Sequence, residues 1–576
     1  ASATDLTADV TAVTTSLSID VTNFTAALTN IDGLTKLESL TITDNGSDSK
    51  NKALDLSSAS FKTTLKTLDI SGSKIEEIKD NGLKDFAALT AIDLGQIKTI
   101  GKNALDGCKK VKSLTIPATV ESVGDNAFDN MADLETLVWN AKINVPAAFE
   151  SDNKLKSITV ASAEATTIAN GAFTSTVVET IDLSGSPKLA TITGAFAAST
   201  KLEKCLLAGT DISDITSDPA LTACAATLKE ITFPAKITAL PKFKNFKVLE
   251  KIDLSGTKVT AIDAKEFQYC EALTEVSLNA ETASIGANAF DGCTVLATIS
   301  NLNNEKLATV GAQAFKGTAL TTVDLSATAL TSIPEELFAD CAALETVVLP
   351  EDITDIAQAA FTHCVKLSSL NLEDTQITTL EMLFTSTYTD ESAPCDALKS
   401  LTLPETLTTV KRNALQMTGL EEITIPSSVT TWGKQVLQGC TSLKKFTWED
   451  PDPSISLIGD NTFLGDDKLE EVYFITKQAW TGISDSDFAG NDPARLNVYV
   501  NAESYASLYA GGWTPANTKY ATLVGEAESE YAFNAKGKSS DGYYYATYYN
   551  ANCDTWFPEA DFEVFSAIVN GSKIEL

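Results

Sequence analysis

A short pattern of apolar residues returns along almost the whole chain. The pattern has the form apolar-x-x-apolar-x-apolar, and Leu37, Leu40 and Ile42 form an early copy. Later copies begin at Leu65, Leu89, Val111, Leu134, Leu155, Val178, Leu202, Leu228, Leu249, Leu273, Leu296, Leu320, Leu344, Leu367, Leu398, Leu420, Leu443, Leu469 and Leu496. Most copies lie about 21 to 26 residues apart, a period typical of repeat architectures that share one continuous core. The 576-residue chain is therefore predicted to be a solenoid.

Each copy of this pattern predicts a short strand. Alternate residues of a strand point to opposite faces, so Leu40 and Ile42 are expected to point inward while Ser39, Thr41 and Thr43 point outward. No single repeat can bury its apolar face alone, so the strands of successive repeats are expected to stack in parallel. The spacing after Leu367 is longer, at 31 residues, and predicts a loop insertion.

The second half of each repeat has its own signature, Ile-Gly-x-x-Ala-Phe-x-x-Cys. Residues Ile285–Cys293 form one clear copy. The glycine permits a sharp turn, and the Ala-Phe pair is expected to begin a short helix or 3-10 turn in which the phenylalanine closes the core. Because these turns are bulkier than the strands, the body is predicted to curve, with the sheet on the concave side and the turns on the convex side.

These motifs resemble the BspA-like leucine-rich repeats of bacterial surface proteins, which are common in Bacteroidetes. The resemblance rests on Leu-x-x-Leu-x-Leu-Pro, as in Leu344–Pro350 and Leu420–Pro426, followed by the Ile-Gly-x-x-Ala-Phe-x-x-Cys segment, and it covers residues 33–515. It implies an α/β leucine-rich-repeat solenoid in a cell-surface or secreted protein. Some relatives act as adhesins toward host matrix proteins or other bacteria, but no family motif specifies a ligand.

The two ends differ in character from the repeats. Residues 1–32 are expected to form an N-terminal spacer and cap, and residues 516–576 a small β-rich C-terminal module. Ten of the thirteen tyrosines lie at or beyond Tyr499, and the run Tyr543–Tyr549 has high strand propensity. These tyrosines fit either a half-buried sheet with cross-strand aromatic pairs or a carbohydrate-binding platform.

The charge excludes several classes of partner. The formal net charge is −34 and the arginines are Arg412 and Arg495, so nucleic acid is not expected as a partner. No apolar run is long enough for a transmembrane segment. The chain begins at Ala1 without Met, and we expect that an export signal or lipid anchor was removed from a cell-surface or extracellular protein.

The sequence predicts no catalytic site, metal site or cofactor. No CxxC pair exists, and His363 is the single histidine, expected in a solvated surface turn. Six cysteines share one phase of the repeat, namely Cys108, Cys270, Cys293, Cys341, Cys364 and Cys440. A recurring phase indicates one kind of slot, so these cysteines are predicted to be buried and free.

The outward positions of the strands are the best functional clue. Their middle column is short, polar and often acidic, with few of the aromatic and arginine residues that dominate interface hot spots. The candidate binding residues are Asp69, Asp93, Asp182, Asp253 and Asp324. They favour a salt-sensitive contact with the basic surface of a protein partner, such as a host matrix or surface protein. The leading hypothesis is non-catalytic adhesion; the alternatives are a glycan-binding accessory protein that uses the C-terminal tyrosines, and a structural spacer.

Overall fold

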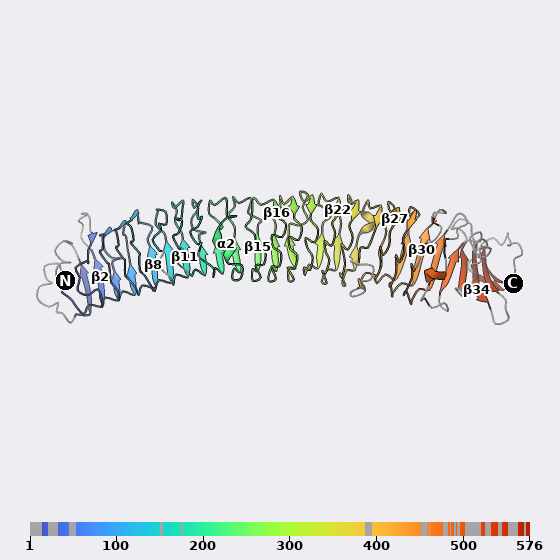
Figure 1. Cartoon of the computed structure of the whole chain (residues 1–576), viewed down its shortest axis with the longest axis horizontal. Helices are drawn as coiled ribbons and strands as arrows, with labels where there is room; N and C mark the ends of the chain where they lie inside the picture. Colours follow the sequence, from blue (N-terminus) through green and yellow to red (C-terminus); the bar gives the residue numbers. More distant parts are fainter. Residues whose placement is uncertain are drawn as a thin grey trace. The chain divides into compact units, whose positions relative to one another are not determined.

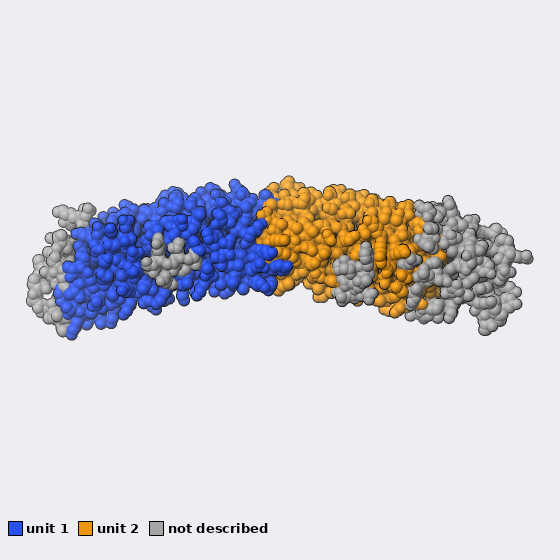
Figure 2. Space-filling view, in the orientation of Figure 1, with its two compact units in different colours: residues 1–260, 269–279 blue, residues 261–268, 280–576 orange. Residues whose placement is uncertain are grey.

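The computed structural model folds the chain into a parallel β-solenoid of stacked coils. It describes residues 14–20, 31, 33–44, 53–149, 154–173, 177–197, 199–385, 394–449, 451, 455, 458–459, 461–475, 482–483, 485–488, 491 and 496–500, and the backbone of strands at 520–524, 531–538, 544–550, 563–569 and 572–575. Two compact units make up the chain (Figure 2). Unit 1 consists of residues 1–260 and 269–279, and unit 2 of residues 261–268 and 280–576.

In unit 1 the leucine segments form a row of parallel strands (Figure 1). These strands are β1 (Ser16–Asp20), β2 (Ser39–Thr43), β4 (Thr67–Asp69), β6 (Ala91–Asp93), β8 (Ser113–Ile116), β10 (Thr136–Trp139), β11 (Ser157–Val160), β12 (Thr180–Asp182), β13 (Lys204–Leu206), β14 (Glu230–Thr232), β15 (Lys251–Asp253) and β17 (Glu275–Ser277). In β8, Leu114 and Ile116 are buried while Ser113 and Thr115 are exposed. The predicted alternation is confirmed, and equivalent residues of successive repeats stand side by side.

Unit 2 repeats the same arrangement. Its longer strands are β19 (Thr298–Ser300), β21 (Thr322–Asp324), β23 (Thr346–Val348), β25 (Ser369–Leu370), β28 (Glu422–Ile425), β30 (Lys445–Glu449), β31 (Glu471–Ile475) and β32 (Asn497–Val500). The row is interrupted between β19 and β21, and again after β25, because β25 pairs with β23 while β28 pairs with β30. The second interruption coincides with the long repeat that follows Leu367.

A second row of two-residue strands runs along the other edge of each unit (Figure 1). The row consists of β3 (Ala53–Leu54), β5 (Glu77–Ile78), β7 (Thr99–Ile100) and β9 (Ser122–Val123) in unit 1, and of β16 (Ala261–Ile262), β18 (Ser284–Ile285), β20 (Thr309–Val310), β22 (Ser332–Ile333), β24 (Asp355–Ile356), β26 (Thr379–Leu380), β27 (Thr409–Val410) and β29 (Thr431–Trp432) in unit 2. Glycine follows several of these strands because a Cβ atom at Gly286 or Gly311 would overlap the backbone of the preceding coil.

The expected short helices opposite the main sheet are not confirmed, so the solenoid is not α/β in this sense. The described helices are α2 (Pro219–Ala223), η1 (Leu372–Asp374) and η2 (Asp485–Phe488). Most coils instead form a run of turns with left-handed residues four apart, such as Asn288 (φ 57°) and Gly292 (φ 73°). The Phe290 N–H between them donates to the Ala314 carbonyl of the next coil at 2.8 Å. A segment that gives alternate N–H groups to its neighbour cannot form the internal bonds of a helix.

The core between the two rows contains stacked aromatic rings. In unit 2, Phe290 lies between Phe267 and Phe315, with ring centroids 5.4 Å and 6.0 Å away. The four phenylalanines predicted to be buried are all fully buried, namely Phe128, Phe290, Phe315 and Phe361. The repeat phase assigned from sequence is therefore correct.

The C-terminal segment continues the strand pattern. It contains β33 (Tyr520–Val524), β34 (Tyr531–Lys538), β35 (Tyr544–Asn550), β36 (Glu563–Val569) and β37 (Ser572–Glu575). β33 pairs in parallel with β32, whereas β34 pairs with β33 and β35 in antiparallel fashion. The tyrosine side chains of this segment, and most of the predicted spacer at residues 1–32, lie outside the described residues.

Candidate functional site

The outward face of the longer strands is the extended surface on which exposed polar side chains recur in register. We define this outward face by the first and third positions of each strand, as in Ser113 and Thr115 of β8. Thr136 and Val138 of β10 lie directly beside these two residues. A partner that contacts the face therefore meets columns of side chains fixed by strand pairing, which reduces the ordering cost of binding.

The five candidate aspartates each hold the turn that follows their strand. Asp69 Oδ1 accepts hydrogen bonds from the Ser71 N–H at 2.9 Å and the Ser71 hydroxyl at 2.7 Å. The same Asp-x-Ser turn occurs at Asp182, Asp253 and Asp324. Asp93 accepts one bond, from the Gly95 N–H at 2.9 Å. Such Asx turns are a common structural use of aspartate, so these residues have a folding role that sequence reasoning missed.

Strand register brings two of the five aspartates together. Asp69 lies opposite Asp93 in the β4–β6 pair. Asp182 is opposite Thr159, and Asp253 is opposite Ser277. Asp324 of unit 2 is opposite Val348. The structure thus offers one acidic pair and three separate carboxylates on the outward face, not a single acidic cluster.

Lysines beside the strands of this face are paired with glutamates of neighbouring coils. The Lys66 Nζ lies 2.8 Å from Glu38, and the Lys251 Nζ lies 2.9 Å from Glu275. Equivalent pairs join Lys229 to Glu203 and Lys444 to Glu421. Exposed pairs of this kind add little stability, but they neutralise much of the positive charge near the strands. Few lysines beside the described strands therefore remain unpaired to balance the negative charge of the chain.

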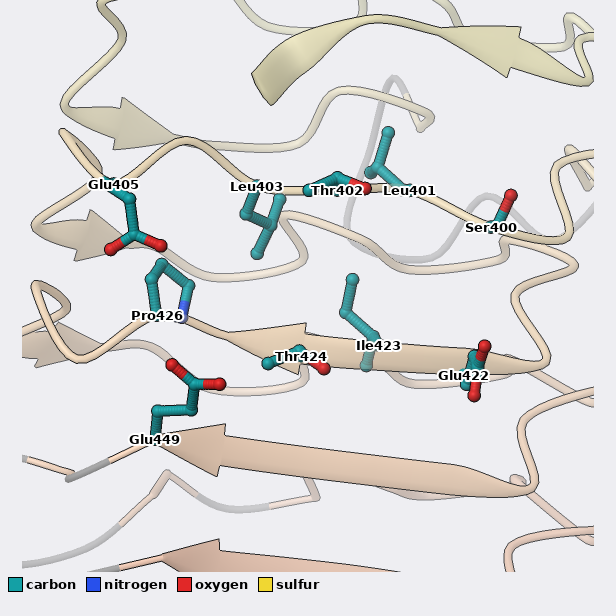
Figure 3. Close-up of a pocket in the computed structure, with 10 residues that line it drawn as sticks. All are labelled: Ser400, Leu401, Thr402, Leu403, Glu405, Glu422, Ile423, Thr424, Pro426 and Glu449. Atoms are coloured by element: carbon teal, nitrogen blue, oxygen red, sulfur yellow. The ribbon is translucent and has the colours of Figure 1, made fainter. Parts of the chain in front are cut away.

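A groove of about 300 Å³ opens in unit 2, where the row of longer strands is interrupted (Figure 3). Its lining comes from residues 400–405, from β28 with Pro426, and from Glu449 at the end of β30. Leu401, Leu403 and Ile423 are buried, and Figure 3 shows Leu403 and Ile423 pointing toward each other from facing segments.

The rim of this groove is acidic. Figure 3 shows Glu405 and Glu449 approaching Pro426 from opposite sides, while Glu422 lies at the other end of β28. All three glutamates are exposed, and none makes an ion pair with a described residue. Hydroxyl groups of Ser400, Thr402 and Thr424 complete the polar part of the lining. The glutamates and hydroxyl groups face solvent, while Leu401, Leu403 and Ile423 are buried and point toward the core.

Asn371 lies at the end of β25, where the row of longer strands is interrupted. Its side chain replaces a strand residue, because its Oδ1 accepts from the Leu349 N–H at 2.7 Å and its Nδ2 donates to the Leu349 carbonyl at 3.1 Å. The chain then enters η1 and leaves the sheet. Sequence analysis missed the groove, and the 31-residue spacing after Leu367 was the one signal that marked its position.

The described thiols and the histidine do not form a reactive pair. All nine described cysteines are buried and free, as predicted for the shared slot, and Cys553 lies outside the described residues. Burial raises the pKa of Cys341 to about 11 and that of Cys108 to about 12. The partly exposed His363 places Nδ1 2.7 Å from Asp340 Oδ1.

Comparison with known families identifies the repeats. The BspA type leucine rich repeat region (6 copies) matches residues 34–147, 140–253, 260–389 and 393–495, which is more than half of the chain. The chain belongs to the BspA-type leucine-rich-repeat family. This BspA-type protein matches no curated protein. Within its described residues, no helix has the length and apolar character needed to cross a membrane.

Several solved structures are similar to this BspA-type protein in fold. A leucine-rich repeat protein from Bacteroides ovatus is 21% identical, with 65% of this chain and 82% of that chain covered and a TM-score of 0.32. A leucine rich cell surface protein from Faecalibacterium prausnitzii is 19% identical, with 75% and 83% covered and a TM-score of 0.21. An internalin from Listeria monocytogenes is 18% identical, with 49% and 82% covered and a TM-score of 0.33.

Proposed function

We propose that this BspA-type protein is a non-catalytic, cell-surface or extracellular binding protein that engages a protein partner through its outward face. The observation that carries the proposal is the register of the longer strands, which holds columns of exposed short polar side chains in fixed positions. A stacked repeat scaffold commonly presents such an extended binding surface. Membership of the BspA-type leucine-rich-repeat family supports this location.

The acidic composition favours a basic partner surface. The chain carries a net charge of −34, and the five aspartates keep one carboxylate oxygen outside the turn bonds described above. Complementary charge raises the association rate of such a pair more than it raises the affinity. A host matrix or surface protein with a basic patch meets this requirement, and we retain the prediction that the outward face lies on the concave side.

The test uses two matched double variants of the full chain. It measures how much of each protein in a panel of surface and matrix proteins each variant captures. Thr115→Arg with Thr322→Arg places two bulky cations on the outward face. Ser122→Arg with Ser332→Arg places the same groups on the short strands of the same coils. We expect the first pair to abolish capture and the second to leave it unchanged. Equal capture by both variants would contradict the proposal.

The two alternatives give different results in the same assay. Glycan recognition by the C-terminal tyrosines requires signal on glycans that neither double variant alters. The spacer function requires that no partner be captured by the repeats at all. The proposed boundary at residue 516 separates these functions, since it assigns strands β33–β37 to a module of their own.

A further inference from the structure

We infer that Asp466 and Asn491 form a proton-operated latch between two neighbouring coils near the end of the repeats. When Asp466 is protonated, its hydroxyl group donates to the side-chain carbonyl of Asn491 and holds the two coils together. When Asp466 is ionised, this bond is lost and the coils separate locally. The latch acts inside the core, so it is independent of the partner that the outward face binds.

Asp466 is a buried carboxyl group with one unpartnered oxygen. It is fully buried at the repeat position that cysteine fills in other coils. Its Oδ1 accepts a hydrogen bond from the Cys440 N–H of the preceding coil at 2.8 Å, which fixes the side chain in place. Its Oδ2 is also buried and has no hydrogen-bond partner. A buried acceptor without a donor raises the free energy of the folded state, and a buried charge raises it further.

Asn491 brings a second unpartnered oxygen to the same place. It lies three residues after Phe488, as Asp466 lies three residues after Phe463, and these two rings stack with centroids 5.4 Å apart. The Asn491 Nδ2 donates to the main-chain carbonyl of Asp466 at 2.8 Å, whereas its Oδ1 is buried without a partner. Because the amide nitrogen and oxygen belong to one planar group, this bond also holds the Oδ1 atom close to Asp466.

A single proton satisfies both oxygens. An ionised carboxylate only accepts hydrogen bonds, so it can do nothing for a neighbouring amide oxygen. A protonated carboxyl group has one O–H donor, and a proton on Asp466 Oδ2 lets this atom donate to Asn491 Oδ1. Burial raises the pKa of Asp466 well above 3.8, which favours the protonated form in the folded chain.

The titratable groups around Asp466 do not stabilise its ionised form. Asp467 is next to it in the same coil and raises the pKa of Asp466 further by repulsion. Burial raises the pKa of Cys440 in the preceding coil, and Asp487 in the following coil is buried. Lys468, in the same coil as Asp466, is exposed. Within the described chain, no cation pairs with Asp466.

The latch lies where backbone bonds join the two coils. The Ile458 N–H donates to the Gly482 carbonyl at 2.8 Å, and the Phe463 N–H donates to the Asp487 carbonyl at 3.1 Å. An ionised Asp466 reaches water only when the following coil moves away, and this movement breaks both bonds. Because the folded state holds the proton more tightly than the unfolded state, the latch is closed at low pH and opens as pH rises through the folded pKa.

Infrared difference spectroscopy of the full chain detects the proton directly. A protonated buried carboxyl group has its own carbonyl band, and the wild-type spectrum minus that of Asp466→Asn isolates the band of Asp466. We expect this band at pH 5 and a weaker band at pH 9. Its absence at pH 5 would overturn the inference, because the folded chain would then hold a carboxylate at this position.

Hydrogen exchange tests whether the proton holds the coils together. After correction for the intrinsic effect of pH, the Ile458 and Phe463 amides of the wild type should exchange at least tenfold faster at pH 9 than at pH 5. In Asp466→Asn the difference should be below twofold, because the new amide group donates to Asn491 at either pH. A wild-type exchange rate that is the same at both pH values would contradict the latch.

Two further variants assign the effect to its residues. Asp467→Asn removes an exposed carboxylate beside the latch and should keep the pH dependence of exchange. Loss of the dependence in this variant would assign the effect to Asp467 instead. Asn491→Leu removes the acceptor and should make exchange of the Phe463 amide fast at both pH values. Wild-type exchange in Asn491→Leu would show that a buried water, not Asn491, accepts the proton of Asp466, and would overturn the inference.

Discussion

At the scale of single residues, the repeat position shared by Cys108, Cys293 and Cys341, here called the cysteine slot, connects neighbouring coils. Each thiol donates to a backbone carbonyl of the preceding coil, as in Cys293 to Phe267 and Cys341 to Phe315, both at 3.1 Å. Thr318 occupies the same slot in its own coil, with its hydroxyl 3.4 Å from the Cys341 Sγ. Where cysteine fills this position, its thiol adds a hydrogen bond between coils, whereas Met131 and Phe246 fill the same position in their coils by apolar packing alone.

We predict that the thiols of the folded protein are inert. Burial raises the pKa of Cys224 and Cys395 to about 12, so thiolate is scarce at pH 8. A thiol-reactive dye at pH 8 should label at most one cysteine in the native protein, namely Cys553, and all ten after denaturation without reductant. If an even number of the ten cysteines stays unlabelled after denaturation, those cysteines form disulfides. This result would contradict the assignment of the cysteines as free.

Asp466 occupies the repeat position that cysteine fills in other coils. Its ionisation should destabilise the folded protein at neutral pH. Its Oδ1 accepts from the Cys440 N–H at 2.8 Å, but its buried Oδ2 has no hydrogen-bond partner. Burial raises the pKa of Asp466 well above 3.8, with Asp467 adding repulsion. Because the folded state holds the proton more tightly than the unfolded state, this contribution to stability falls as pH rises from about 4 through the folded pKa.

The substitution Asp466→Asn removes this pH dependence. We expect it to increase the free energy of unfolding by about 1–3 kcal/mol at pH 7, because asparagine accepts the same Cys440 bond without burying a negative charge. The gain should shrink toward zero near pH 4 in denaturant titrations. A gain that does not vary with pH would show that ionisation of Asp466 is not the cause.

At the scale of elements, the stack of phenylalanines stabilises each coil against its neighbours. We predict that Phe290→Ala lowers the free energy of unfolding by about 3–5 kcal/mol, as for other buried phenylalanines. Val295→Ala in the same repeat is the control, because Val295 is 43% exposed, and its effect should stay within about 0.5 kcal/mol. Denaturant unfolding measures both. Similar losses for the two variants would contradict the packing described here.

The turns after the longer strands restrict which substitutions can test the role of charge. The carboxylates of Asp69 and Asp93 both hold Asx turns, so replacing them with lysine would also remove these turn bonds. We now predict that Asp69→Asn with Asp93→Asn keeps the turns, since asparagine supplies the same acceptor oxygen. This variant should slow association with a basic partner at low salt without lowering the melting temperature. If the association rate changes neither with salt nor in the variant, the aspartates have a structural role only.

The elements also show what the sequence could and could not predict. Strand phase, buried phenylalanines and buried cysteines were predictable because each repeat rebuilds the same slot. The turns were not, because left-handed positions hold residues such as Lys265 and Glu336, whose identity does not reveal a positive φ. The end of the sheet at β25, where the Asn371 side chain bonds to the Leu349 backbone, was not predictable either, because no pattern of apolar residues encodes such a side-chain bond.

At the scale of the whole molecule, the protein is an acidic repeat scaffold, and we propose that one face of it binds a partner. Most lysines beside the strands form ion pairs with glutamates of neighbouring coils. They are therefore not available to neutralise the remaining carboxylates, and the net charge stays at −34. Screening at physiological salt limits this charge to a range of about 8 Å. Under the proposed function, partner choice is therefore decided close to the surface, by the columns of the outward face.

The central claim is that a partner contacts the outward face, and footprinting of a captured complex tests it most directly. Hydroxyl-radical labelling of the full chain with and without partner reports protection at each side chain. We predict protection at outward positions such as Thr115, Asp253 and Thr322, with none at Ser122 or Ser332 of the short strands. Protection confined to the short strands, or to residues 516–576, would contradict the account.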